Sequence, residues 1–123
     1  YRRMVSLCKR AVDMSDETLM GFVTEAYPIV AFCKQLENKE RRLMEIMECE
    51  IQPDGTRVFR PLFQYQITEN RVEDGKFIIT GSHRQVNAIS DSLARRFMEN
   101  GMPQEMLKKL LAVPEEGKEV QAV

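Results

Sequence analysis

Apolar residues recur at helical spacing over the first quarter of the chain. One helix face ahead of residue 13 would hold an apolar set made up of Met4, Cys8, Ala11 and Val12. A second run follows Ser15, a favourable N-cap, and opens with Asp16, whose negative charge suits a helix N-terminus. Its apolar positions are Leu19, Phe22, Val23 and Ala26. We therefore predict a helix over 16–26, preceded by a helical segment that starts at Tyr1.

A short, wholly apolar run comes next. Tyr27 precedes Pro28, which disfavours helical backbone at Tyr27, and residues 29–33 read Ile-Val-Ala-Phe-Cys. A run of this length without polar alternation is typical of a strand buried on both faces. The pattern predicts a strand in the middle of a sheet.

Three further segments favour strands, because apolar and polar residues alternate along them. They cover residues 41–51, 59–67 and 76–80, and a polar turn at 37–40 precedes the first. Pro-Asp-Gly at 53–55 and Glu-Asp-Gly at 73–75 separate them as turn sequences. We predict three successive antiparallel strands, a meander.

Two details of this meander concern its faces and edges. In residues 41–51 the alternation predicts that Glu48 and Glu50 lie on a solvent-exposed face, opposite an apolar set of Leu43, Met47, Cys49 and Ile51. Pro61 lacks a backbone N–H, so it indicates an edge strand or a bulge.

The C-terminal third changes back to helical spacing. Gly81 is expected to break the last strand, and Val86, Ile89, Leu93 and Phe97 mark one face of a helix that ends at Asn100-Gly101. Pro103 can open another short helix, whose apolar residues are Met106, Leu107, Leu110 and Leu111. We assign residues 1–113 to one folded unit and expect residues 114–123, polar and aperiodic, to be a flexible tail.

Composition narrows the class of protein. The 123 residues suit one domain with a single core, and the net charge of −1 does not favour a nucleic-acid partner. The three cysteines fall on apolar phases and are interpreted as reduced core thiols, which favours the cytosol. The eight methionines are expected mainly to fill the core. The chain opens at Tyr1 within a helical pattern, so we expect it to be part of a longer protein.

Few residues of the sequence suggest a catalytic or ligand-binding role. The sequence contains neither Gly-x-x-x-x-Gly-Lys-Ser/Thr nor Gly-x-Gly-x-x-Gly, so a phosphate-cradling loop is missing. His83, the single histidine, is interpreted as a polar loop or capping residue at a strand-to-helix junction, rather than a catalytic partner of Ser82. Among several basic pairs, Arg41 and Arg42 are the best candidates for touching phosphate, because they open a strand beside the presumed central one. We predict no catalytic residue and no metal ligand.

Six segments stand in an order that is known from one protein family. They are a helical segment at 1–20, a hydrophobic strand at 29–37, an arginine-led strand at 41–46, a Phe strand at 59–65, a Gly-x-Phe-x-x-Thr-Gly segment at 75–81 and a closing Gly-x-Pro within 97–103. In this order they resemble the tight-adherence (CpaF-like) branch of the type II/type IV secretion ATPases. The sequence departs from the family where Pro61-Leu62 replaces Asp-Ile, and where His83-Arg84-Gln85 stands in place of Arg-Pro.

This resemblance implies that the chain is the C-terminal part of an α/β, P-loop (RecA-like) motor domain. The parent would be a cytoplasmic homo-hexamer at the inner face of the membrane that couples ATP hydrolysis to pilus assembly or secretion. ATP and Mg²⁺ would bind upstream, so this chain would be non-catalytic. Its partners would be the remainder of the motor domain, neighbouring subunits and an inner-membrane platform protein, with Arg41 and Arg42 sensing phosphate or making a subunit contact. The alternative is a free-standing α/β module that binds a protein.

Overall fold

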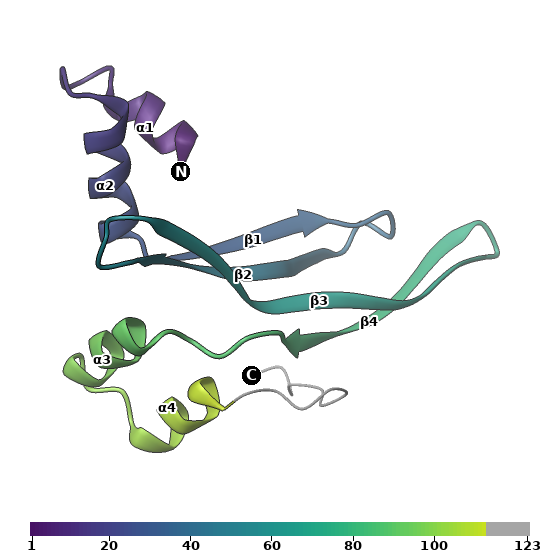
Figure 1. The fold of residues 1–123 in the computed structure, drawn as a ribbon. Helices are drawn as coiled ribbons and strands as arrows, with labels where there is room; N and C mark the ends of the chain where they lie inside the picture. The colour runs from purple at the N-terminus through teal and green to yellow at the C-terminus, as the bar shows by residue number, and fades with distance from the viewer. Residues whose placement is uncertain (113–123) are drawn as a thin grey trace.

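The computed structural model describes residues 1–112. These residues form four helices and a four-stranded antiparallel sheet in the order β1-β2-β3-β4 (Figure 1). The elements are α1 (Arg2–Cys8), α2 (Asp16–Ala26), β1 (Ile29–Gln35), β2 (Arg41–Ile51), β3 (Arg57–Glu73), β4 (Lys76–Gln85), α3 (Asp91–Glu99) and α4 (Gln104–Leu111). The mixed α/β class and the antiparallel meander that the sequence predicts are confirmed. The expected tail, residues 114–123, lies outside the described residues.

The N-terminal helices form a pair with a small core of their own. The hydroxyl of Ser15 accepts a hydrogen bond from the Thr18 N–H, and α2 has the predicted bounds. Helix α1 is shorter than the pattern suggests, and its buried residue is Val5, which packs with Leu19 and Val23. The predicted face was wrong, because Met4 is exposed and α1 ends before Ala11 and Val12 are reached.

Strand β1 lies at the edge of the sheet, not in its middle. It pairs with β2 alone, and all seven of its residues are exposed. The sequence prediction was wrong here because, among the described residues, neither a further strand nor a helix covers this strand.

Strands β2 and β3 form the predicted hairpin. Gly55 has a φ of 86°, and the Gln52 N–H donates to the Thr56 carbonyl across the turn. The pairing register shifts between Ile46 and Met47, whose partners are Phe63 and Pro61, so β3 carries an extra residue beside the proline. This bulge confirms one of the two predictions for Pro61, while β3 itself is an internal strand.

The β3–β4 hairpin turns at Asp74 and Gly75, which have φ values of 50° and 73°. Two successive positive φ values are those of a type I′ turn, for which Asp-Gly is a preferred sequence. Strand β4 continues through Gly81 to Gln85, so the predicted break was wrong. A Cβ on Gly81 would lie 2.7 Å from the Tyr65 ring on β3. The glycine therefore leaves room for this ring beside β4.

The chain leaves the sheet in an extended segment before the C-terminal helices. We predicted a helix from Val86, but α3 begins at Asp91 with Ser90 as its N-cap. The Val86 N–H donates to the Leu62 carbonyl and the Ile89 N–H to the Leu110 carbonyl, so tertiary partners replace helical hydrogen bonds there. Asn100 and Gly101, with a φ of 89°, end α3 as predicted, and Pro103 precedes α4 as predicted.

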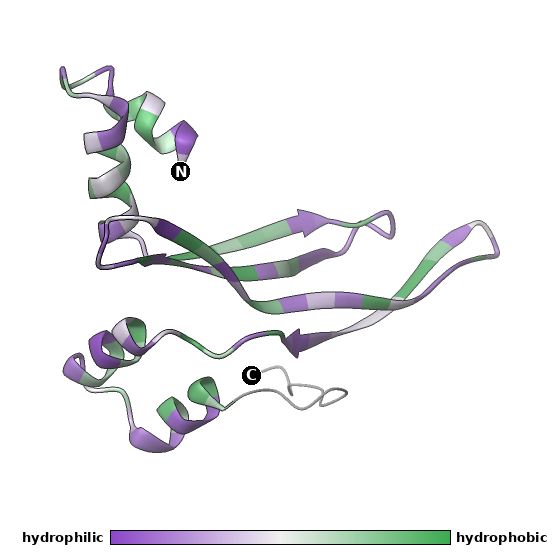
Figure 2. Cartoon of the chain, viewed as in Figure 1, coloured by the Kyte–Doolittle hydropathy of each residue, from purple (hydrophilic) through white to green (hydrophobic). Residues whose placement is uncertain are grey.

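The helix pairs lie on opposite sides of the sheet, and each has its own core (Figures 1 and 2). The predicted single core is therefore replaced by two clusters; the one beneath the sheet consists of Leu62, Ile89, Leu93, Ala94 and Leu107. None of the eight methionines is fully buried, and Met20 and Met102 pack against the two clusters, so the prediction of core filling is confirmed for these two alone. Of the free cysteines only Cys49 is buried, whereas Cys33 is exposed.

Candidate functional site

The two arginines chosen from the sequence open β2, opposite the end of β1. Arg41 faces Gln35 and is exposed, and Arg42 faces Lys34. The Arg42 guanidinium forms a 2.7 Å ion pair with Glu40 and lies 5.6 Å from the Tyr65 ring centroid. Arg42 is thus held against the sheet by charge and by a cation–π contact. A role in phosphate sensing or subunit contact remains a prediction.

His83 lies within β4, so its assignment to a loop was wrong. Its ring is 5.0 Å from the Tyr65 ring, and its Nε2 atom is 2.8 Å from the Leu43 carbonyl oxygen. Ser82 and His83 are adjacent on a strand, and their side chains therefore point to opposite faces. This geometry does not form a Ser–His catalytic pair, and it gives the imidazole a packing role.

Among residues 1–112, the most deeply buried charged side chain is one that the sequence placed in solvent. Glu48 is 1% exposed, and its carboxylate accepts hydrogen bonds from the Ser90 N–H, at 3.1 Å, and from the Ser90 hydroxyl. Ser90 also caps α3, because its hydroxyl accepts from the Leu93 N–H at 3.1 Å. Glu48 therefore lies at the N-terminus of α3, where the helix dipole favours a negative charge.

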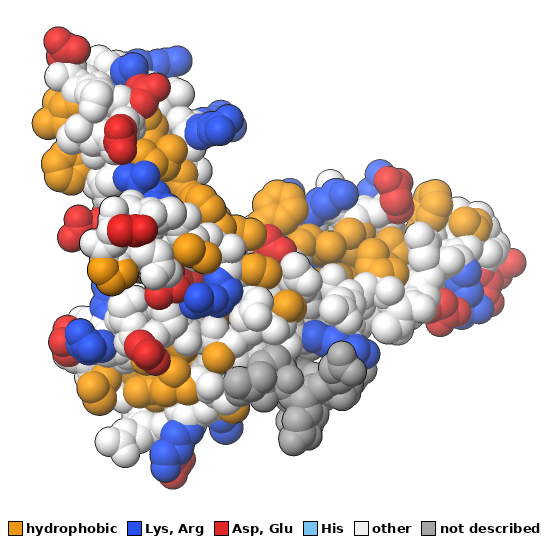
Figure 3. All heavy atoms as spheres, viewed as in Figure 1, with side chains coloured by type: hydrophobic (Ala, Val, Ile, Leu, Met, Phe, Trp, Pro, Cys, Tyr) orange, Lys and Arg blue, Asp and Glu red, His pale blue; other side chains and the backbone are white. Residues whose placement is uncertain are grey.

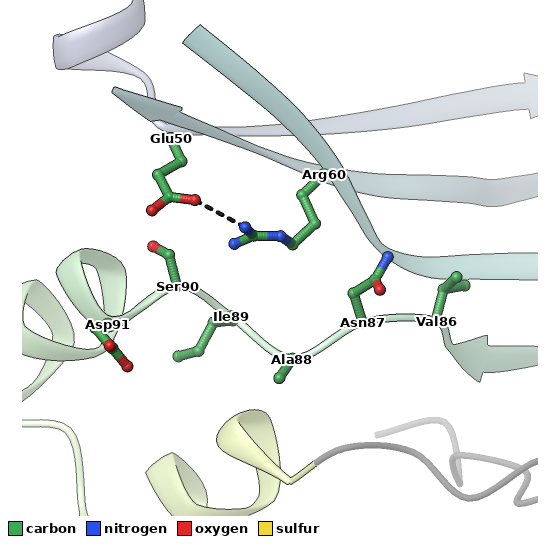
Figure 4. Close-up of a pocket in the computed structure, with 8 residues that line it drawn as sticks. All are labelled: Glu50, Arg60, Val86, Asn87, Ala88, Ile89, Ser90 and Asp91. Carbon is green, nitrogen blue, oxygen red and sulfur yellow. Dashed lines mark ion pairs between the residues drawn. The ribbon is translucent and has the colours of Figure 1, made fainter. Parts of the chain in front are cut away.

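Arg60 of β3 completes this cluster. One terminal nitrogen of its guanidinium is 2.8 Å from Glu50, and the other is 3.8 Å from Glu48. Figure 4 shows Arg60 reaching from the sheet toward Glu50 and Ser90, above the extended segment 86–90. These residues line an open cavity of about 420 Å³, together with Asp91.

The cluster is better suited to holding β2, β3 and α3 together than to catalysis. Both oxygens of Glu48 already accept hydrogen bonds, and Arg60 is shared between two carboxylates. Neither carboxylate is thus placed as a free general base. One feature of the sequence indicates this burial. Glu48 lies two residues from the apolar Ile46, so both side chains point to the same face of β2. In the structure Ile46 packs against the core beneath the sheet.

Two further groups could have offered a nucleophile. Burial raises the pKa of the Cys49 thiol, and the neighbouring Glu48 raises it further against the lowering effect of Arg57. Burial likewise raises the pKa of the Tyr1 phenol, whose hydroxyl donates to the Tyr27 carbonyl at 2.5 Å. A raised pKa keeps the thiol protonated at neutral pH, so Cys49 is not an activated nucleophile.

Within residues 1–112, no group of three or more His, Cys, Asp or Glu side chains is arranged to hold a metal ion. No helix in this part of the chain combines the length and apolarity needed to cross a bilayer.

Neither the protein-family models nor the curated proteins yielded a match to this chain. The family resemblance therefore rests on the sequence segments described above.

Proposed function

We propose that this chain is the C-terminal, non-catalytic part of the motor domain of a secretion or pilus-assembly ATPase of the CpaF-like branch. The observation that supports the proposal is an uncovered apolar surface on the sheet. Val30 and Phe32 of β1 point to the same face as Met47 of β2 and Phe59 of β3, by the pairing register. We call these four residues the open face.

The open face is unusual for a surface that contacts only solvent. Val30, Phe32 and Phe59 are 40%, 56% and 49% exposed. Figure 3 shows hydrophobic side chains gathered over β1 and β2, in the angle between the N-terminal helices and the sheet. Contiguous apolar patches of this kind mark surfaces that another segment or another protein covers.

The area of the whole chain supports the same interpretation. The chain exposes 9408 Å², whereas a compact monomer of its mass exposes roughly 6,800 Å². The chain thus exposes more surface than a compact monomer of its mass does.

The position of Tyr1 indicates what could cover the open face. Its ring lies 5.8 Å from the Phe59 ring, and its hydroxyl bonds to the chain just ahead of β1. A segment preceding Tyr1 would therefore reach the sheet beside the open face and the free edge of β1. In the proposed parent, the remainder of the motor domain packs there and contributes the strands that β1 lacks.

The parent would bind ATP and Mg²⁺ through residues upstream of Tyr1. As a hexamer at the inner face of the membrane, it would convert ATP hydrolysis into movements that assemble a pilus or drive secretion through a platform protein. Arg41 and Arg42 would sense phosphate or contact a neighbouring subunit. Replacing both by alanine in the parent should then lower the ATPase rate, and an unchanged rate would refute that role.

The proposal is tested by reading the gene upstream of the Tyr1 codon. A P-loop in the same reading frame supports it, and a start codon directly before Tyr1 refutes it in favour of a free-standing interaction module.

A binding experiment then tests the open face. The upstream polypeptide, produced separately, should bind this chain and should lose binding to Phe32→Asp. The matched control is Phe77→Asp, a similarly exposed phenylalanine, 44% against 56%, on the β3–β4 hairpin. Equal binding by the two variants would refute the role of the open face.

A further inference from the structure

The first twelve residues carry a net positive charge, unlike the chain as a whole. Arg2, Arg3, Lys9 and Arg10 give this segment four positive charges, and it contains no acidic residue, although the whole chain has a net charge of −1. All four side chains are exposed. Lys9 pairs with Asp16 at 2.5 Å, whereas the three arginines form no ion pair with any residue from 1 to 112.

Exposed apolar side chains lie among these charges. Leu7 is 53% exposed and Met4 is 36% exposed, and Val12 and Met14 in the following loop are 44% and 42% exposed. Arg3 and Leu7 are four residues apart on α1, so they lie on the same side of the helix, and Arg10 follows in the turn after α1. We call residues 2–4, 7, 10, 12 and 14 the basic-apolar surface.

The fold presents this surface outward. Val5 fixes α1 against α2 and Cys8 packs beside it, whereas the remaining side chains of α1 are exposed. Figure 1 shows α1 and α2 rising from one end of the sheet, and Figure 3 shows Lys and Arg side chains around them, with Asp and Glu side chains also present. A planar partner could therefore approach the helices without meeting the sheet.

We propose that the basic-apolar surface binds an anionic lipid membrane. Arginine side chains would meet lipid phosphates, and Leu7 and Met4 would enter the boundary between headgroups and acyl chains. This combination favours lipid over nucleic acid, since a nucleic-acid surface gains from exposed aromatic rings on which bases stack. The only aromatic ring among residues 1–14, that of Tyr1, is packed against Phe59. The inference rests on charge and exposure and is independent of the secretion-ATPase proposal.

The test is co-sedimentation of the full chain with vesicles of phosphatidylcholine alone or mixed with phosphatidylglycerol. Binding should require phosphatidylglycerol and should weaken with salt. Each basic residue near an anionic surface strengthens binding by roughly fivefold, so removing three should weaken it on the order of 100-fold. The test variant is Arg2→Gln/Arg3→Gln/Arg10→Gln.

A matched control changes the net charge equally on α3 and α4, across the sheet from α1. Arg95→Gln/Lys108→Gln/Lys109→Gln alters three exposed basic residues of α3 and α4 and should leave vesicle binding within a few-fold of the unaltered chain. Leu7→Gln should weaken vesicle binding without a change in charge. Equal loss in the two triple variants, or binding to duplex DNA but not to phosphatidylglycerol vesicles, would overturn the proposal.

Discussion

Replacing Glu48 by alanine should weaken the attachment of α3 to the sheet. The carboxylate is 1% exposed, and it accepts two hydrogen bonds from Ser90 at the N-terminus of α3. Arg60 lies 3.8 Å away and would lose one of its two carboxylate partners. The substitution thus leaves the buried Ser90 N–H without an acceptor and leaves the Ser90 hydroxyl with Ser92, at 3.0 Å, as its remaining side-chain partner. It also opens a cavity between β2 and α3.

The expected cost follows from these contacts. A hydrogen bond to a charged group contributes about 1.5–3 kcal/mol, and removing one partner from a buried ion pair costs about 3–5 kcal/mol. These terms overlap, so Glu48→Ala should lower the free energy of unfolding by about 3–5 kcal/mol. Glu48→Gln keeps an acceptor for the Ser90 N–H and should cost only about 1–2 kcal/mol.

The assay is urea unfolding followed by circular dichroism, with free energies compared at an unchanged slope. Glu50→Ala is the matched control, because Glu50 pairs with Arg60 at 2.8 Å but its side chain is 19% exposed, against 2% for Glu48, so its removal should cost less. If Glu48→Ala does not fold, the graded pair of Glu48→Gln and Ser90→Ala supplies the comparison. A loss below about 1 kcal/mol for Glu48→Ala, or an equal loss for Glu50→Ala, would refute the reasoning.

Three further predictions follow from local geometry. Gly81→Ala should destabilise the fold by about 2 kcal/mol or more, because its Cβ would lie 2.4 Å from a backbone oxygen. Gly55→Ala places its Cβ where no atom lies within 4 Å, so it should cost only about 1–2 kcal/mol, the strain of a positive φ in a residue with a side chain. Denaturation midpoints check this order. The hydrogen bonds of Asp54 in the β2–β3 turn lower its pKa from 3.8, so its stabilising contribution is present above that pH and is lost as the pH falls through the lowered value; an NMR titration checks the direction. Maleimide should label Cys33, which is exposed, well before Cys49, whose burial raises its pKa, and mass spectrometry would show the reverse order if this is wrong.

The elements that the sequence predicted well are those set by local chemistry. Ser15 caps α2 through its own neighbour, and Gly55 and the Asp74–Gly75 pair adopt the positive φ values that their turns need. In each case the required partners lie within a few residues, so a short stretch of sequence contains the whole cause.

The misplaced elements depend on contacts distant in sequence. Gly81 ends a strand by local propensity, yet here it accommodates the ring of Tyr65 on the neighbouring strand. Glu48 is polar by composition and buried in the structure, because Ser90, forty-two residues later, supplies its hydrogen bonds. Alternation within one strand could not identify this partner, and it therefore could not decide which face of β2 is enclosed.

The position of β1 connects the sequence to the proposed function. Its first five residues have the composition of a strand enclosed on both faces, and the structure leaves every residue of β1 exposed. Edge strands are normally protected by charge, proline or a bulge, and β1 has only Lys34 near its end and a register shift after Phe32. An edge protected so weakly is a pairing site. We therefore expect the chain without an upstream partner to self-associate in sedimentation velocity experiments, and Phe32→Asp to reduce that association more than Phe77→Asp does. A stable monomer at high concentration would instead favour the free-standing module.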